Sequence, residues 1–450
     1  MPRFDAAALS FARAHRSHPL SFLRPHLASP PPSVSRYLRK AVENGEEEIP
    51  WDSLKFLMGD AMYGGRVSDD FDRRILSTYC NEFFGDFLFD TFQQFFFSRD
   101  GHDYQLPPQG SPFEAYVKQV QALPLTCSPA VFGLHANAEI GYFNNRIRDM
   151  WRDLILLQPR VSSTGDGMNP EEYKSQTAKD IESKVPIPTD MMMMITKFGL
   201  EPTPTQIVLL QELARFNLLV ESMAISLTDV QRALKGEIGM SANLDALGDS
   251  LLNGYVPVMW KKFAPDTDKG LVAWINHFLH RQEQFTAWSE NGIAPTVMWM
   301  AGMTIPESFL TALVQQVCRA NQWPLDKVDM FTRVSEFIEP NEVTAPLVGG
   351  HYVCGLFLEG ARWDTGENCL RAQLPKVLVQ KLPILEVYPA EANKIKRHET
   401  FATPVYVTQR RRNAMGVGLC FTADVASDRH ESHWILQGVA LCLNVEGDTL

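Results

Sequence analysis

Three aspartates stand close together in the stretch GDAMYGGRVSDDFDRR (59–74) and could in principle do chemistry. Asp69, Asp70 and Asp72 supply carboxylates, the oxygen ligands that a hard cation such as Ca²⁺ or Mg²⁺ prefers. A DDxD pattern lacks the glycine and the twelfth-position glutamate of a calcium-binding loop. We therefore expect a glycine turn followed by a helix start, with Ser68 or Asp69 as the capping residue.

Two histidine pairs have the spacing of metal ligands on a helix. His277 precedes His280 in HFLH, and His430 precedes His433 in HESHW. Residues three apart share a helix face, so each pair could hold one metal ion. Because no third ligand stands nearby in the sequence, packed or solvated histidines are the simpler interpretation. We predict no metal site and no catalytic residue.

Several glycine-rich stretches could in principle bind phosphate. A P-loop requires GxxxxGK[ST], because backbone N–H groups, a lysine and a hydroxyl together hold the phosphates. The stretches YGGRVSDD, LVGGHYVCG and MGVGLC do not match that pattern, and GxGxxG is absent. The motifs GxSxG and CxxC do not occur either. We therefore expect no nucleotide site and no bound cofactor.

The arginine run QRRRNA (409–414) is the most basic short segment of the C-terminal third. Three arginines could contact an anionic surface, but a solvated loop between two strands is the simpler interpretation. The net charge of −11 and the pI of about 5.5 show no basic excess that would favour nucleic acid. The sequence contains no run of about 18 apolar residues, so no membrane span is predicted.

The chain has 450 residues, of which 45% are hydrophobic, and seven cysteines. An odd cysteine count without CxxC pairs favours a reducing compartment over a disulfide-stapled secreted fold. Residues 1–32 end in the proline-rich stretch ASPPPS, which predicts a disordered leader.

Apolar spacing predicts long helices in the middle of the chain. Residues 205–235 have apolar side chains spaced alternately four and three apart, which predicts a seam over four heptads. A shorter helix is expected to fold back on this one. Helices are also expected over 269–288 and over IPESFLTALVQQVCRANQW, where Pro306 lies in the first turn. The seam residues are Leu209, Leu213, Phe216, Val220, Met223, Leu227, Val230 and Leu234.

The character of the sequence changes after about Asp326. Short β-branched and apolar runs separated by Gly, Pro, Asn and Asp predict an antiparallel sheet or a small barrel. Helices first and strands later define an α+β fold rather than an alternating βαβ one.

Several strings, in colinear order from about Glu48 to Asn444, resemble the C-terminal part of dynein heavy chains. They begin with IPWDSLKFLMGDAMYGGRVSDDFDRR and FGLHANAEI, and continue through the long helical segment to GLFLEGARWD and HWILQGVALCLN. The form GLFLEGARWD is similar to the axonemal members of the family. The stretches MAGMTIP and NAMGVGL depart from the family pattern, and we expect these differences to affect surface contacts.

The resemblance implies a domain order and a function. Residues 33–110 would be the helical lid of the sixth AAA+ module. Residues 111–330 would be the helical part, and residues 331–450 the β-rich subdomain, of the dynein C-terminal domain. The chain would be a structural and regulatory part of an ATP-driven, minus-end-directed microtubule motor of the cytoskeleton, in a ciliary or flagellar axoneme. Its partners would be the other AAA+ modules, the intermediate and light chains and, indirectly, the microtubule, with no nucleic acid and no membrane.

Packing residues, namely the 209–234 seam with Trp260, Trp274 and Trp288, are expected to be the important ones. Arg66 and Arg73 are predicted to face a neighbouring module. Two alternatives stay open at this point: a free-standing regulatory protein descended from the same region, and an enzyme that uses the His and Asp clusters.

Overall fold

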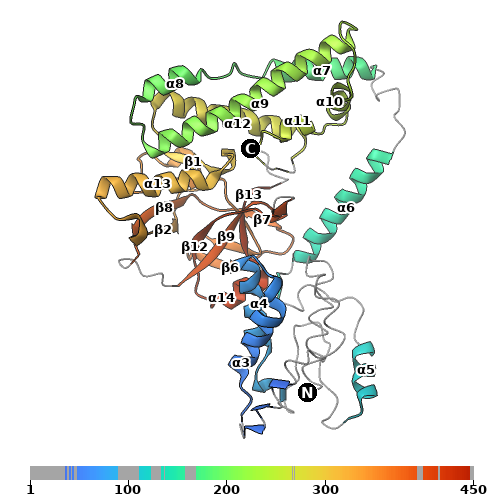
Figure 1. Cartoon of the computed structure of the whole chain (residues 1–450), viewed down its shortest axis with the longest axis vertical. Coiled ribbons are helices and arrows are strands. Elements are labelled where there is room, and N and C mark those ends of the chain that lie inside the picture. Colours follow the sequence, from blue (N-terminus) through green and yellow to red (C-terminus); the bar gives the residue numbers. More distant parts are fainter. Residues whose placement is uncertain are drawn as a thin grey trace.

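The computed structural model shows helices at both ends of the molecule and sheets between them (Figure 1). The lid helices lie below the sheets in this view, α7–α12 form a layer above them, and α6 runs along one side. The predicted α+β class is confirmed. The structure describes residues 36–37, 40–41, 43–44, 48–89, 111–122, 133–135, 137–157, 169–265, 267, 269–392, 399–413 and 416–445. The leader predicted for residues 1–32 lies outside these ranges.

The lid is built from two short antiparallel helical segments. It consists of α3 (Trp51–Phe56), the π-helix η3 (Leu57–Tyr63), the 3-10 turn η4 (Gly64–Arg66), α4 (Asp70–Phe83) and η5 (Asp86–Phe89). Asp69 caps α4, because its carboxylate accepts the backbone N–H of Asp72 at 3.0 Å. The expected helix start is confirmed, with Asp69 rather than Ser68 as the cap.

Gly64 is required at the end of the π-helix. A Cβ on Gly64 would collide with the carbonyl of Gly59, which lies one π-turn earlier. The backbone of Gly64 has φ −74°, an ordinary helical value. Gly64 is therefore explained by missing side-chain volume, whereas a Cβ on Gly65 would meet open space. The predicted need for backbone freedom was wrong, since neither glycine has a positive φ.

Among the remaining helices, α9, α10, α12 and α13 match the predicted periodic segments. A capping box of Thr203 and Gln206 starts the 31-residue α9. Pro306 is the first residue of α13, as expected. The helices are α5 (Phe113–Ala122), α6 (Ala138–Leu157), α7 (Pro170–Glu182), α8 (Met191–Phe198), α9 (Pro204–Leu234), α10 (Ala242–Leu252), α11 (Val258–Lys261), α12 (Leu271–Asn291), α13 (Pro306–Asn321) and α14 (Glu431–Gln437).

The predicted seam of α9 forms the centre of the upper layer. From Leu209 to Val230 every seam residue is buried, and Leu234 at the end is partly buried. The shorter helix α10 packs back against α9, as predicted. Trp260, Trp274 and Trp288 are also buried, with Trp260 stacked on Trp274. The predicted packing residues are confirmed.

Two main sheets lie beneath these helices. One has the strand order β1-β3-β8-β2 and the other β12-β9-β13-β4-β7. Their strands are β1 (Val297–Trp299), β2 (Val328–Val334), β3 (His351–Cys354), β4 (Phe357–Glu359), β7 (Val379–Lys381), β8 (Leu385–Glu391), β9 (Thr400–Thr408), β12 (Leu419–Ala426) and β13 (Ala440–Asn444). Two small ribbons pair β5 (Ala361–Asp364) with β6 (Cys369–Ala372), and β10 (Arg412–Asn413) with β11 (Gly416–Val417).

The sheets are mixed, so the prediction of an antiparallel sheet or small barrel was only partly right. β1 pairs with β3 in parallel, and β13 pairs with β9 in parallel. A helix lies in each connection, α13 and α14 respectively, as parallel pairing requires. Among the described strands no ladder closes a barrel. β2 and β12 approach each other through Thr332, whose hydroxyl accepts the N–H of Asp424 at 2.6 Å.

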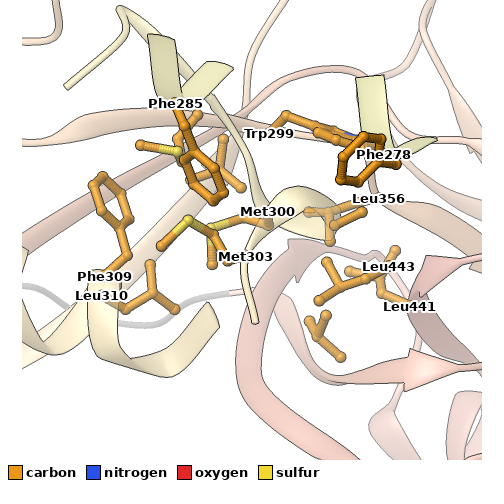
Figure 2. Close-up of a cluster of buried hydrophobic side chains, with 14 of the residues drawn as sticks. Phe278, Phe285, Trp299, Met300, Met303, Phe309, Leu310, Leu356, Leu441 and Leu443 are labelled. Carbon is orange, nitrogen blue, oxygen red and sulfur yellow. The ribbon is translucent and has the colours of Figure 1, made fainter. Parts of the chain in front are cut away.

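β1 was missed by the sequence analysis because it contains only three residues between two helices. It begins the buried stretch MAGMTIP (300–306), in which Met300, Ala301 and Met303 are almost fully buried. These residues meet Phe285, Phe309 and Leu441 in the core between the helices and the sheets (Figure 2). The departure of this stretch from the family pattern therefore affects the core, and its assignment to surface contacts was wrong.

Candidate functional site

Arg73 lies on the exposed face of α4, and its side chain folds back to the residues that precede this helix. Its guanidinium donates to the carbonyl of Val67 at 2.9 Å. Arg66 belongs to the 3-10 turn η4 just before α4. Contacts of Arg66 and Arg73 with a neighbouring module remain a prediction.

The neighbouring Arg74 joins the lid to the sheets. Its guanidinium donates to the carbonyl of Ala402 on β9 at 2.9 Å and lies over the rings of Phe71 and Phe401. The same face of α4 packs against α14. Burial lowers the pKa of Arg74, and Glu431 on α14 opposes this. The role of Arg74 was not predicted from the sequence, because Ala402 lies 328 residues further along the chain.

Residues 133–135 and Asn137 precede α6, and Asn137 is bonded to the sheet region. The side-chain amide of Asn137 donates to the carbonyls of Leu374 and Val377 at 2.7 and 3.0 Å. Its oxygen accepts the N–H of Lys376 at 2.8 Å. Gly133 has φ +87°, and a Cβ there would lie 3.0 Å from Leu436. Both residues are therefore structural requirements of this connection.

Arg411, from the arginine run, is partly buried at the same junction. Its guanidinium donates to Glu359 on β4 at 2.9 Å and to the carbonyl of Gly438 at 3.0 Å. It also lies over the ring of Tyr406. The interpretation of the whole run as a solvated loop was therefore wrong at Arg411, while Arg410 is exposed.

A second polar junction lies between the helices and the first sheet. Glu212 on α9 is fully buried. Its carboxylate accepts the backbone N–H groups of Thr304 and Ile305 at 2.8 and 3.1 Å. Ile305 is the N-cap residue just before α13, and its apolar side chain cannot cap the helix. Glu212 thus caps α13 from another helix, where a negative charge also suits the helix dipole.

Arg281 on α12 completes this junction and is itself almost fully buried. It donates to the carbonyl of Gly302 at 2.8 Å and to the Thr304 hydroxyl at 3.2 Å. Its guanidinium lies over Phe216 and Phe285. Burial lowers the pKa of Arg281 to about 10, and Glu212 opposes the shift. The arginine stays charged at neutral pH.

A sequence signal for Arg281 existed and was passed over. The apolar residues of α12 are spaced 3, 4, 7 and 3 apart, and Arg281 occupies the position that divides the gap of seven between Phe278 and Phe285. A charged residue in the middle of a buried seam indicates a specific polar partner.

Carboxamide side chains form peptide-like pairs at three further contacts. The oxygen of Gln284 accepts the Trp299 N–H at 2.9 Å, and its nitrogen donates to the Trp299 carbonyl at 3.3 Å. Gln284 thereby occupies the edge of β1. Gln380 bonds Trp363, and Asn217 bonds Thr189, in the same two-sided way.

The histidine pairs have structural roles. His277 is buried, and burial lowers its pKa to about 3. Both His277 and His280 pack against the ring of Trp299. His430 caps α14, while His433 contacts Arg429 at 3.0 Å. Within the described residues no group of three or more His, Cys, Asp or Glu side chains could hold a metal ion.

The partly buried cysteines are poor nucleophiles. Burial raises the pKa of Cys354 and of Cys420 to about 12, so the reactive thiolate is scarce at neutral pH. No helix in the described part of the chain is long and apolar enough to cross a membrane. The polar junctions can therefore position elements and transmit force, which is the kind of site that this structure offers.

The class of protein follows from two family profiles that cover these parts in order. The profile for the AAA lid domain of dynein heavy chains matches residues 32–138. The profile for the C-terminal domain of dynein heavy chains matches residues 144–443. This protein belongs to the dynein heavy chain family and corresponds to its C-terminal region.

Individual relatives place it with the axonemal type. It is 51% identical over 414 residues to "Dynein-1-alpha heavy chain, flagellar inner arm I1 complex" of Chlamydomonas reinhardtii. It is 50% identical over 412 residues to human "Dynein axonemal heavy chain 10", and 34% identical over 421 residues to mouse "Dynein axonemal heavy chain 2". These alignments cover 92%, 91% and 92% of this chain. The chain spans 9% of the length of each of these relatives.

Proposed function

We propose that the chain is the structural and regulatory C-terminal end of an axonemal dynein motor, acting in ciliary or flagellar movement. In this proposal the motor is ATP-driven and moves towards microtubule minus ends, and this region has no nucleotide site of its own. The division at 33–110, 111–330 and 331–450 belongs to the proposal. The partners also belong to the proposal: they are the other AAA+ modules, the intermediate and light chains and, indirectly, the microtubule.

The observation that supports a bracing role is the exposed face of α6. Apolar side chains are spaced alternately three and four apart along this helix, yet all are exposed, Phe143 by 53% and Leu157 by 79%. Figure 1 shows the helix running between the lid and the upper helices on the outside of the molecule. This face, called the α6 seam, consists of Ile140, Phe143, Ile147, Met150, Leu154 and Leu157.

An apolar heptad seam is typical of a helix that packs on a partner. Burying each of these side chains would contribute on the order of 1–3 kcal/mol. Because the chain spans only 9% of the length of its relatives, most of a heavy chain lies outside this structure. We infer that the occupant of the α6 seam is another module of the same heavy chain, so that α6 restrains the modules relative to one another.

A charge introduced into the α6 seam tests this function. In a dynein heavy chain that contains this region, Met150→Asp with Leu154→Asp should lower microtubule gliding velocity and the thermal stability of the motor. The same pair in the isolated chain should change the free energy of unfolding by less than about 1 kcal/mol, because both side chains are exposed there.

The control is Asn145→Asp, which adds a charge to an exposed position of α6 outside the seam. Motors with the double substitution that glide and unfold like the wild type would refute the bracing role. An isolated 450-residue chain that binds dynein independently of the seam would favour the alternative of a free-standing regulatory protein.

A further inference from the structure

His135 lies three residues before the start of α6. Its side chain is 9% exposed. Its buried Nδ1 faces the Gln373 side chain, and neither this nitrogen nor the buried Oε1 of Gln373 makes a hydrogen bond of good geometry in the described part of the chain. Asn137, two residues later, is bonded to the backbone of Leu374 and Lys376, and Gly133 lies close to Leu436.

Two charged groups face the imidazole. Glu359 approaches from β4, and Arg411 approaches from the turn after β9, and these two form an ion pair at 2.9 Å. Burial lowers the pKa of His135 and Arg411 adds to the shift, while Glu359 and the contact with the Gln373 side chain oppose it. Protonating His135 would place a second cation beside Arg411, with Glu359 already paired.

We propose that His135 is a proton-sensitive latch, and that its protonation releases residues 133–137 from the sheets and with them the base of α6. The neutral imidazole tolerates this interior, whereas the imidazolium requires water or a new partner. The latch belongs to this chain alone and does not depend on the proposed motor function.

The sign of the pH dependence follows from linkage. The pKa of His135 is lower in the closed junction than in the opened one, where it returns towards about 6.5. The opened junction therefore binds more protons as the pH falls. The closed junction has its full stability at pH values above the pKa that His135 has in the opened state. This stability is lost as the pH falls towards the pKa that His135 has in the closed state.

Amide hydrogen exchange of the full 450-residue chain, followed by mass spectrometry, measures this opening. The reporters are the amides of Ala138, Gly141 and Lys376, which are bonded to His135 or Asn137. After correction for the chemical exchange rate, they should exchange roughly threefold or more faster at about pH 5.5 than at about pH 7.5. Amides in the core of α9 report global unfolding, and their corrected exchange rates should not rise in this way between about pH 7.5 and about pH 5.5.

His135→Gln keeps a polar side chain that cannot take up a proton, so the pH dependence of the reporters should disappear. Glu359→Gln removes the carboxylate that favours the imidazolium in the closed junction, so protonation should open the junction more easily and the midpoint of opening should move to higher pH. His433→Gln, on α14 beside Arg429, is the control and should behave like the wild type.

Reporters that exchange at a pH-independent corrected rate in the wild type would overturn the latch. A His135→Gln variant that keeps the wild-type pH dependence would do the same. If that variant opens the junction at every pH, Glu359→Gln decides, and an unmoved midpoint would count against the proposal.

Discussion

Glu212 and Arg281 place opposite charges inside the helical layer, each bonded to the chain that enters α13. Desolvating two charges is expensive, and only good geometry with several hydrogen bonds offsets the cost. Here the carboxylate accepts two backbone N–H groups, while the guanidinium donates to a carbonyl and a hydroxyl. We infer that the pair specifies the position of the buried stretch 300–306.

Replacing Glu212 should therefore destabilise the chain strongly. Glu212→Ala leaves two buried N–H groups and the charge of Arg281 uncompensated, which should cost on the order of 3–5 kcal/mol. Glu212→Gln keeps an acceptor and should cost about 1–3 kcal/mol. Chemical denaturation measures both values.

Glu221, exposed on the same helix, provides the matched control. Glu221→Ala should change the free energy of unfolding by less than about 0.5 kcal/mol. Equal effects of Glu212→Ala and Glu221→Ala would contradict the capping role.

At the scale of elements, hydrophobic periodicity predicted the helices that bury a full stripe. The helices α9, α12 and α13 were predicted for this reason, and so was the capping of α4 by Asp69. Local patterns determine these features, because helix faces and caps involve residues a few positions apart.

Long-range pairing was not predictable in the same way. The parallel pairing of β1 with β3 and of β9 with β13 depends on connections that contain a helix. Arg74, Arg411 and Asn137 find partners more than 50 residues away. Their types are compatible with an exposed position, so the sequence alone gives no sign of these contacts.

The two faces of α9 should differ sharply in their response to truncation. Met223 is fully buried in the seam, whereas Ile225 is 63% exposed. Met223→Ala should lower the free energy of unfolding by about 2–5 kcal/mol, because it removes buried atoms and leaves a cavity. Ile225→Ala should lower it by less than about 0.5 kcal/mol.

Urea denaturation of the two variants makes the comparison. Similar losses for Met223→Ala and Ile225→Ala would mean that α9 packs on its neighbouring helices through another face than the seam.

For the whole molecule, the lid and the sheets meet at Arg74 and along α14. α4 also packs Ile75 against the large core, and it contacts η3 and α3 within the lid. The small lid core of Leu54, Met58, Leu76 and Cys80 is separate from the large core that the helices share with the sheets. Movement of the lid relative to the sheets should therefore depend strongly on one arginine.

Arg74→Ala should loosen this attachment while leaving the large core folded. Hydrogen exchange should become several-fold faster in α4 and around Phe401, because a charge-assisted contact is lost at a local opening. Exchange in α9 should stay unchanged.

Arg73→Ala is the matched control, since Arg73 is the exposed neighbour that bonds its own turn. If both substitutions accelerate exchange at Phe401 equally, the attachment does not depend on Arg74.

The position of β13 also has a consequence for biosynthesis. This strand, Ala440–Asn444, lies between β9 and β4, both of which precede it in the chain. A ribosome releases β9 and β4 first, yet neither can complete its ladder until residues 440–444 have emerged. The five-stranded sheet must therefore close after translation has passed this point. A premature stop codon a few positions upstream would remove the middle of the sheet rather than its edge.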